Sequence, residues 1–382
     1  MSKILSALQS EALNLLRFPL ALIVVLIHVF SVLPTTFNVD PNIPLSLFDK
    51  FSIIISAFLR GISVPIYFFI SGYVFFREGI LTKQLYVNKL KNRSKSLLAP
   101  YIIWNAVAVL LIVIKSAPVF SSFLSYSGTT CDLSFSNILS CFWEYNGKLS
   151  PPPSTVTNYE DFIRPTPYPI NTALWFLRDL MIVVLCTPVI FVAIKKIRIY
   201  FILLLSAIYI VTNYWIVDYH VTQLSTAFFF FSWGAYMSIN KLNFLSIFDT
   251  VKKETAIFYV VNSIAYMLVT SRYPLLASTL KLINTFLAVV VSFNIASFLI
   301  VKKHLSSNVF LSSSSFFIYI THCLITARVT KVLFMTLKPN SDIQVLSVYL
   351  LTFVIVITFL LITFYLLRRF TPRLLKVIAG RK

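Results

Sequence analysis

Arg17 and His28 stand in an otherwise apolar stretch of the sequence, LLRFPLALIVVLIHVF at residues 15–30. If this stretch is helical, the eleven steps between them advance roughly 1100°, about 20° more than three full turns, so both side chains share one face. They would then stand ~16 Å apart along the helix axis. A guanidinium binds anions such as phosphates, and an imidazole can accept a proton near neutral pH. The pair therefore predicts one polar face that combines anion binding with acid–base chemistry.

The composition indicates that this face belongs to a membrane protein. Of the 382 residues, 58% are hydrophobic and 12% are charged, and the mean hydropathy is +0.84. A soluble domain cannot bury so much apolar surface, whereas apolar stretches near 20 residues match a hydrocarbon core of ~30 Å. Because a lipid-facing Arg at a helix centre costs about 2.5–3.5 kcal/mol, Arg17 and His28 are expected to face the interior of a bundle. The simpler alternatives are that Arg17 reaches the headgroups and that His28 bonds a neighbouring carbonyl.

The apolar pattern predicts an all-α fold, a polytopic transmembrane helical bundle of about ten spans that forms a single integral-membrane domain over residues 1–382. The spans are expected at residues 13–34, 52–76, 98–116, 173–194, 199–217, 221–239, 255–271, 280–300, 313–334 and 345–367.

The charges predict how these spans are oriented. The net charge of +20 comes from 33 Lys and Arg against 13 Asp and Glu. Most cations lie in alternate connections, including a basic loop at 77–97 and a basic tail at 368–382. By the positive-inside rule, both termini are cytoplasmic, the loop at about 117–172 is extracytoplasmic, and the chain is a multi-pass protein of the cytoplasmic (inner) membrane. The charge is thus explained by topology and the lipid bilayer, and no nucleic-acid partner is expected.

The four cysteines are too few for a disulfide framework. Cys131 and Cys141 share the loop at 117–172 and could pair if that loop faces an oxidising compartment, which the sequence leaves open. Cys186 and Cys323 lie in apolar segments and are interpreted as packing residues.

Further polar residues lie in or beside the predicted spans. The stretch RGISVPIYFFISGYVFF contains Arg60 and a patch of Ser71, Gly72 and Tyr73 that is typical of close helix packing. The other stretches are KLKNRSKSLLAPYIIWN, a basic helix expected to stop or bend at Pro100, ALWFLRDL with Trp175, Arg178 and Asp179, and FFIYITHCLI with His322.

These stretches carry a family resemblance. Arg17, ten intervening residues and His28 resemble the R-x10-H signature of the acyltransferase 3 family of integral-membrane O-acyltransferases. The stretches VPIYFFISGY, RSKSLLAPYIIW, LWFLRDL and SFFIYITHCLI resemble further landmarks of that family, in the same order along nearly the whole chain. The resemblance implies transfer of an acyl group, usually acetyl, from acyl-CoA to a saccharide hydroxyl of a cell-envelope glycan.

The resemblance also assigns candidate roles. His28 is expected to be the general base or to carry the acyl group, with Arg17 and His322 as further catalytic residues. Acetyl-CoA, the expected donor, would bind through its phosphates to the cations Arg17, Arg93, Lys89, Lys91 and Lys95. The acceptor hydroxyl or an oxyanion would be held by Arg60, Ser71, Tyr73, Trp175 and Arg178. No spacing typical of metal ligands is visible, and no metal is expected.

Two other interpretations compete with this one. Ten spans with buried Arg and His could form a proton-coupled secondary transporter or a glycan flippase, although no internal repeat is visible. A relative that has lost catalysis and serves in export is the third. The sugar, its hydroxyl, the acyl chain, the side of acceptor approach, a homodimer and association with envelope-glycan enzymes are left open by the sequence.

Overall fold

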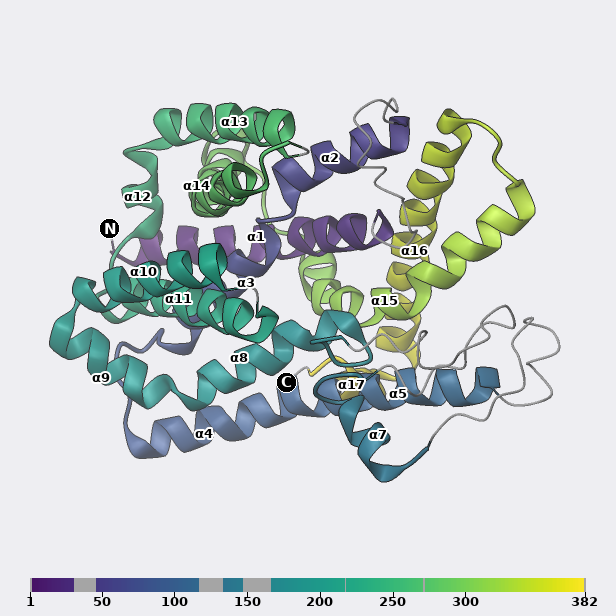
Figure 1. The fold of residues 1–382 in the computed structure, drawn as a ribbon. Coiled ribbons are helices and arrows are strands. Elements are labelled where there is room, and N and C mark those ends of the chain that lie inside the picture. Colours follow the sequence, from purple (N-terminus) through teal and green to yellow (C-terminus); the bar gives the residue numbers. More distant parts are fainter. Residues whose placement is uncertain are drawn as a thin grey trace. The chain divides into compact units, whose positions relative to one another are not determined.

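The computed structural model describes residues 2–30, 46–116, 133–146, 166–216, 218–270 and 272–380, and every regular element within them is a helix (Figure 1). The all-α prediction is therefore confirmed for these residues. Amide and carbonyl groups of a helix bond to one another within the segment, which is what a chain in contact with hydrocarbon requires.

All ten predicted spans overlap helical segments, and the predicted ends at residues 31–34, 217 and 271 lie outside the described residues. Eight are single helices, namely α1 (Ser2–Val29), α5 (Ala99–Ser116), α10 (Ile199–Trp215), α11 (Tyr219–Ile239), α13 (Lys252–Val269), α14 (Pro274–Lys303), α15 (Val309–Leu337) and α16 (Asp342–Phe370). The other two are broken, into α2 (Leu47–Leu59) with α3 (Ser63–Phe75) and into α8 (Trp175–Leu185) with α9 (Thr187–Ile197). Within the described residues, six segments are long and apolar enough to cross a membrane, or seven if α8 and α9 form one crossing. The protein is thus polytopic, and the total of ten stays a prediction.

The bend of 60° between α8 and α9 has a local cause. Pro188 stands in the first turn of α9 and has no amide hydrogen, so the carbonyl of Val184 loses its usual helical donor. The hydroxyl of Thr187 donates to that carbonyl instead, at 2.7 Å. The side chain therefore replaces the bond that proline removes.

Backbone carbonyl groups at the break between α2 and α3 accept hydrogen bonds from neighbouring helices. The carbonyl oxygen of Ala57 accepts a hydrogen bond of 2.9 Å from the side-chain amide of Asn284 on α14, and the carbonyl of Phe58 accepts one from the hydroxyl of Tyr259 on α13. Asn284 also donates to Ser263 at 2.7 Å and accepts from Asn262 at 2.9 Å. The backbone groups released by the break are therefore bound by side chains of α13 and α14.

Several helices were not among the predicted spans: α4 (Lys83–Arg93), α7 (Phe135–Ser140), α12 (Phe244–Asp249) and α17 (Pro372–Ile378). The basic helix α4 continues into α5 through a π-helical turn, Ser94–Leu98. Pro100 was expected to stop or bend this helix, but the run continues past it from Lys83 to Ile114. The irregular turn lies just before Pro100, where the missing amide hydrogen disturbs regular α-helical bonding.

The chain divides into two compact units. Unit 1 comprises Met1–Lys89 and Val183–Tyr365, and unit 2 comprises Leu90–Ile182 and Leu366–Lys382. In unit 1, α1 packs along α15 and α14, α3 along α11, and α13 along α14. In unit 2, α17 packs on α5, where the indole of Trp104 donates to the carbonyl of Ile378 at 2.8 Å. The single domain over residues 1–382 stays a prediction.

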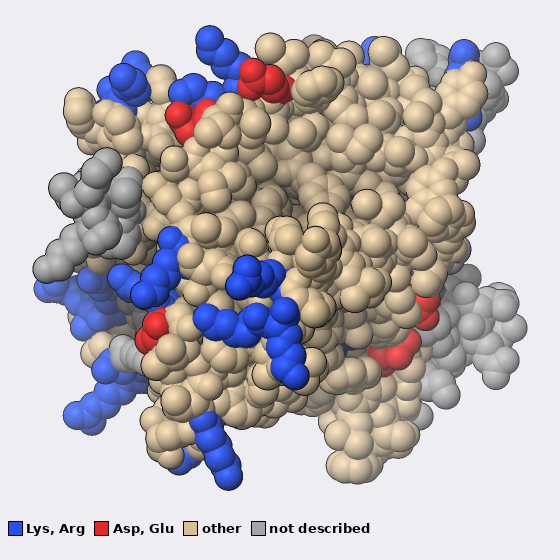
Figure 2. All heavy atoms as spheres, turned by 90° about the vertical axis from the view of Figure 1, so that its left-hand side faces the viewer, with Lys and Arg blue, Asp and Glu red and all other residues tan. Residues whose placement is uncertain are grey.

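Basic residues gather at one set of helix ends in unit 1. They occupy the last turns of α9 (Lys195 and Lys196) and α14 (Lys302 and Lys303) and the first turn of α13 (Lys252 and Lys253). Figure 2 shows the side of the molecule where α9 and α12 are labelled in Figure 1, and Lys and Arg outnumber Asp and Glu on it. This distribution agrees with the positive-inside pattern, and the orientation with cytoplasmic termini stays a prediction.

The backbones of α3 and α11 approach each other closely at Gly72 and Gly234. Among the described glycines of unit 1, these two lie closest to another backbone. A Cβ atom at Gly72 would lie 1.9 Å from the carbonyl oxygen of Phe231, and one at Gly234 would lie 2.0 Å from that of Phe69. Only hydrogen fits at either position, because two packed backbones have no freedom to move aside. The close packing predicted for Gly72 is confirmed.

We expect Gly72→Ala to lower the free energy of unfolding by the upper end of the ~1–3 kcal/mol range for overpacking, or more, because the methyl group meets backbone. The effect is measured as the shift of the thermal unfolding midpoint in detergent, with size-exclusion chromatography as the readout of folded protein. Gly61→Ala is the matched control, since its Cβ would meet the side-chain hydroxyl of Thr285 at 2.8 Å and that hydroxyl can rotate. Equal midpoints for Gly72→Ala and the wild type would contradict the proposed contact.

Candidate functional site

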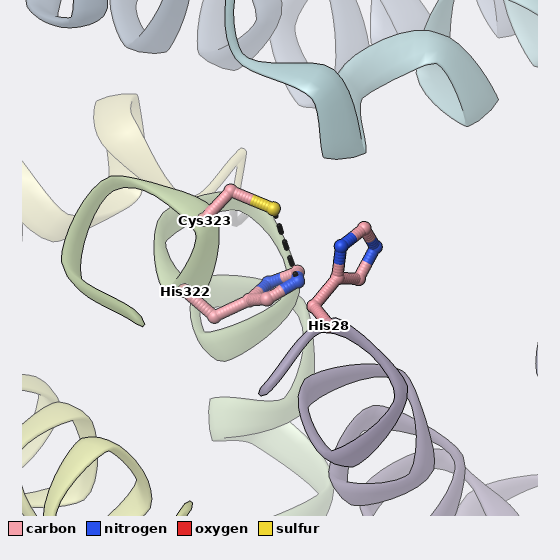
Figure 3. A group of neighbouring side chains, drawn as sticks. All are labelled: His28, His322 and Cys323. Atoms are coloured by element: carbon pink, nitrogen blue, oxygen red, sulfur yellow. Dashed lines mark hydrogen bonds between the residues drawn. The ribbon is translucent and has the colours of Figure 1, made fainter. Parts of the chain in front are cut away.

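Two imidazoles lie together where α1 packs against α15. His28 stands in the last turn of α1 and His322 in the middle of α15, with ring centroids 4.9 Å apart and planes inclined by 59° (Figure 3). His322 is fully buried and His28 is partly buried. Both residues were predicted as catalytic from the sequence, and the structure brings them into contact. Their catalytic roles stay predictions.

Cys323 is the third member of this cluster. Its Sγ lies 3.3 Å from Nε2 of His322, and the ligand atoms of Cys323, His322 and His28 all lie within 4.8 Å of one another. Cys323 and His322 can exchange a proton at 3.3 Å, and the three atoms are close enough to hold one metal ion. From the sequence, Cys323 was interpreted as a packing residue, and its place in this cluster was not predicted. The only indication in the sequence was that Cys323 directly follows His322. The pair becomes a candidate site because α1 packs against α15 and brings His28 next to it.

The tautomer of His322 follows from its hydrogen bonds. Nδ1 lies 2.7 Å from the carbonyl oxygen of Tyr319 and 3.2 Å from that of Ile318. Because a carbonyl only accepts, Nδ1 carries the hydrogen and donates it, which leaves the lone pair on Nε2. The backbone of α15 therefore orients the ring so that its basic nitrogen faces the thiol of Cys323.

Two tyrosines connect the imidazoles to the turn of α1 that contains Arg17. The hydroxyl of Tyr67 on α3 donates to the backbone carbonyl of Arg17 at 2.9 Å. The ring of Tyr67 lies 6.1 Å from that of Tyr319, and the ring of Tyr319 lies 6.1 Å from that of His322. Arg17 is itself partly buried. Tyr67 and Tyr319 thus form a series of contacts between the turn of Arg17 and the imidazole of His322, and neither tyrosine was singled out from the sequence.

Arg60 lies inside the apolar segment Leu47–Phe75, as expected for the second span. It caps the C-terminal end of α2 at the break before α3, and its side chain is exposed. Its guanidinium still interacts electrostatically with the imidazole of His28. Tyr73 instead packs away from the imidazoles, with its hydroxyl 3.1 Å from Oε1 of Gln9 and its ring 5.1 Å from Phe244. Ser71 is partly buried on α3, next to the helix-packing glycine.

Trp175 and Arg178 belong to unit 2. Arg178 is 2% exposed, and its Nε donates to Asp179 Oδ1 at 2.9 Å. Its Nη1 donates to the carbonyls of Trp143 and Pro167, at 2.9 and 3.0 Å. These bonds tie the start of α8 to the preceding loop, a geometry that favours a structural role over the predicted contact with acceptor. The ring of Trp175 lies 6.5 Å from that of Tyr168.

The four predicted phosphate-binding cations of the basic helix do not share one face. Lys89 pairs with Glu78 at 2.5 Å and donates to the carbonyl of Phe75. Residues four apart lie on one face of a helix, so Lys89 and Arg93 point to one side and Lys91 and Lys95 to another. Lys91 and Lys95 are exposed, and Arg93 is partly buried.

Cys141 is a free, buried thiol in unit 2 that donates to the carbonyl of Asn137 at 3.2 Å. Cys131, the partner considered in the sequence analysis, lies outside the described residues. Burial raises the pKa of the Cys141 thiol to about 11.

Since the folded state holds the neutral thiol, we expect native Cys141 to resist alkylation at pH 8 and to react once the protein is unfolded in detergent. The stability that the neutral thiol contributes should be lost as the pH rises from the ordinary thiol pKa towards 11. Mass spectrometry of iodoacetamide-treated protein measures the reaction. Rapid labelling of Cys141 in folded protein at pH 8 would contradict this burial.

An all-α bundle of long apolar helices with buried acid–base side chains at a helix–helix contact defines an integral-membrane protein with a candidate catalytic centre inside the bundle. Residues 10–369 match the family model of the acyltransferase domain, acyltransferase 3. The chain belongs to this family, as its motifs indicated, and is a membrane acyltransferase. No curated protein and no solved structure matched the chain in the corresponding comparisons.

Proposed function

We propose that this membrane acyltransferase is an O-acetyltransferase that moves an acetyl group from cytoplasmic acetyl-CoA to a hydroxyl of a cell-envelope saccharide. The observation that carries the proposal is the proximity of the imidazoles of His28 and His322, whose ring centroids lie 4.9 Å apart, in a chain that belongs to this family. An alcohol that attacks a thioester must lose its proton, and imidazole is the side chain suited to accept it near neutral pH.

The partial exposure of His28 supports its role as the base for the acceptor. His322 is fully buried, whereas His28 is partly exposed, so His28 is the more accessible of the two imidazoles. Arg60 interacts electrostatically with His28. A cation with this interaction would help to stabilise the negative charge that develops on the thioester oxygen.

The donor would bind on the side of Arg17. Acetyl-CoA carries several phosphate charges, and charge-assisted hydrogen bonds from a guanidinium are suited to them. Arg17 is partly buried, and its backbone carbonyl accepts the hydrogen bond of Tyr67. With the termini in the cytoplasm, this end of α1 faces the compartment that contains acyl-CoA.

We expect Arg17→Ala to weaken binding of CoA roughly 10- to 100-fold, the equivalent of about 1.5–3 kcal/mol for one hydrogen bond to a charged group. Isothermal titration with CoA and the KM for acetyl-CoA measure the effect, and the KM for the acceptor should change little. Arg17→Lys is the matched control and should retain part of the affinity. Unchanged CoA affinity in Arg17→Ala would remove Arg17 from donor binding.

Mass spectrometry of envelope glycans from cells with and without the protein tests the proposed function. Cells that express the wild type should contain glycans heavier by the mass of an acetyl group, and cells that express His28→Ala should not. Purified protein that consumes acetyl-CoA only when a glycan acceptor is added would support the same conclusion. Glycans with identical acetylation in all three strains would contradict it.

A further inference from the structure

We propose that Cys323 is a catalytic nucleophile that carries the acetyl group as a thioester between donor and acceptor. This inference rests on the proposed function and adds to it a covalent intermediate on a residue that the R-x10-H pattern does not contain. Neither the position nor the chemistry of Cys323 was evident from the sequence.

The cluster has the arrangement of an activated nucleophile. Sγ of Cys323 lies 3.3 Å from Nε2 of His322, and Nδ1 of the same ring donates to the carbonyl of Tyr319 at 2.7 Å. A nucleophile within reach of a base, with that base oriented by a third group, is the geometry found in covalent catalysis by cysteine and serine. Figure 3 shows the sulfur directed towards Nε2 of His322, with the ring of His28 beside that of His322.

The place of Cys323 along its helix fits a carrier between the two sides of a membrane. α15 extends from Val309 to Leu337, and Cys323 is its central residue. At a rise of 1.5 Å per residue, each end of the helix is ~21 Å from this position. Residue Cys323 is partly exposed, whereas the neighbouring His322 is fully buried.

In the first half-reaction, the thiol proton of Cys323 passes to Nε2 of His322 as the sulfur attacks the thioester carbonyl of acetyl-CoA. The bond from the acetyl carbon to the CoA sulfur breaks, and a bond to Sγ of Cys323 forms. The CoA thiolate leaves and takes the proton from His322. One thioester replaces another, so the step needs no external energy source, oxidant or reductant.

In the second half-reaction, His28 accepts the proton of the acceptor hydroxyl as its oxygen attacks the acetyl group on Cys323. The bond from the acetyl carbon to Sγ breaks, an oxygen ester forms, and the Cys323 thiolate regains a proton from His28. The two histidines thus serve different half-reactions. His322, bonded to the thiol, serves the donor, and the partly exposed His28 serves the acceptor.

Isotope exchange tests directly whether the first half-reaction occurs without the second. Purified wild-type protein is incubated with acetyl-CoA and isotopically labelled CoA in the absence of any acceptor. If an acetyl-enzyme forms, label from CoA should appear in acetyl-CoA. A peptide that contains Cys323 should also gain the mass of one acetyl group, and neutral hydroxylamine should remove that group. Neither measurement requires a variant to fold.

Variants then separate the roles. We expect Cys323→Ala and Cys323→Ser to reduce exchange to background, with Cys323→Ser preserving the size of the side chain. Cys186→Ala is the matched control, since Cys186 is also a free, partly exposed cysteine of unit 1, and it should exchange like the wild type. His28→Ala should still exchange label but lose transfer to the glycan, a separation that a purely structural role for the cluster would not produce.

Three results would overturn the proposal. Wild-type protein that acetylates glycan without exchange, or Cys323→Ala that transfers at the wild-type rate, would refute the intermediate and leave the proposed function standing. Zinc bound in stoichiometric amount to the wild type and lost in Cys323→Ala would make the thiol a metal ligand instead. Wild-type protein that neither consumes acetyl-CoA nor modifies glycan would refute the proposed function itself, and the intermediate with it.

Discussion

Replacing His28 with alanine is expected to reduce acetyl transfer to the glycan roughly 10²- to 10⁴-fold, the usual contribution of a general base. The reason is geometric: His28 is the partly exposed member of a cluster whose other imidazole is fully buried. Transfer is measured with purified protein, acetyl-CoA and glycan, by following the esterified product.

The control for this experiment is His304→Asn. His304 is exposed and caps the end of α14 with a φ of 52°, a left-handed conformation that asparagine tolerates better than most residues. It should retain wild-type transfer and the same elution profile in detergent. Full activity in well-folded His28→Ala would exclude His28 from the mechanism.

The second large effect concerns stability. Asp179→Ala should lower the free energy of unfolding by about 3–5 kcal/mol, because it leaves the guanidinium of Arg178 buried without its carboxylate. The side chains of the pair are 2% and 1% exposed. The shift of the thermal unfolding midpoint, measured by intrinsic fluorescence in detergent, checks this prediction.

Asp249→Ala provides the comparison. It breaks the ion pair between Lys252 and Asp249, whose side chains are 52% and 57% exposed at a distance of 2.8 Å. An exposed pair contributes about 0–1 kcal/mol, so this midpoint should hardly move. If both variants unfold at the same temperature, Arg178 and Asp179 do not act as a buried pair.

Features that depend on one helix could be predicted from the sequence. The all-α fold and the positions of the helical segments follow from apolar periodicity. The close packing at Gly72 follows from residue size, because a small residue in an apolar helix is useful only where another backbone approaches. The shared face of Arg17 and His28 follows from eleven steps of 100°.

Features that depend on contacts between helices could not be predicted in this way. Cys323 looked like a packing residue because its significance requires His28, which comes from the other end of the sequence on α1. Arg60 lies within the predicted span, but the apolar run of 29 residues does not reveal that the helix is interrupted there or that the side chain is exposed.

The interactions of polar side chains were equally hidden. Arg178 and Asp179 are neighbours that would point apart on a regular helix, yet they bond at 2.9 Å because the guanidinium turns back towards the loop carbonyls. The cations of the basic helix appeared to be one cluster, whereas helical periodicity divides them between two faces.

The bonds at the break between α2 and α3 constrain how the bundle can open. Asn284 holds the free carbonyl of α2 with one amide hydrogen and Ser263 of α13 with the other, so three helices are fastened at a single side chain. A movement that separated these three helices would leave several polar groups without hydrogen-bond partners in an apolar environment. α2, α13 and α14 should therefore move as one rigid block whenever the bundle changes shape.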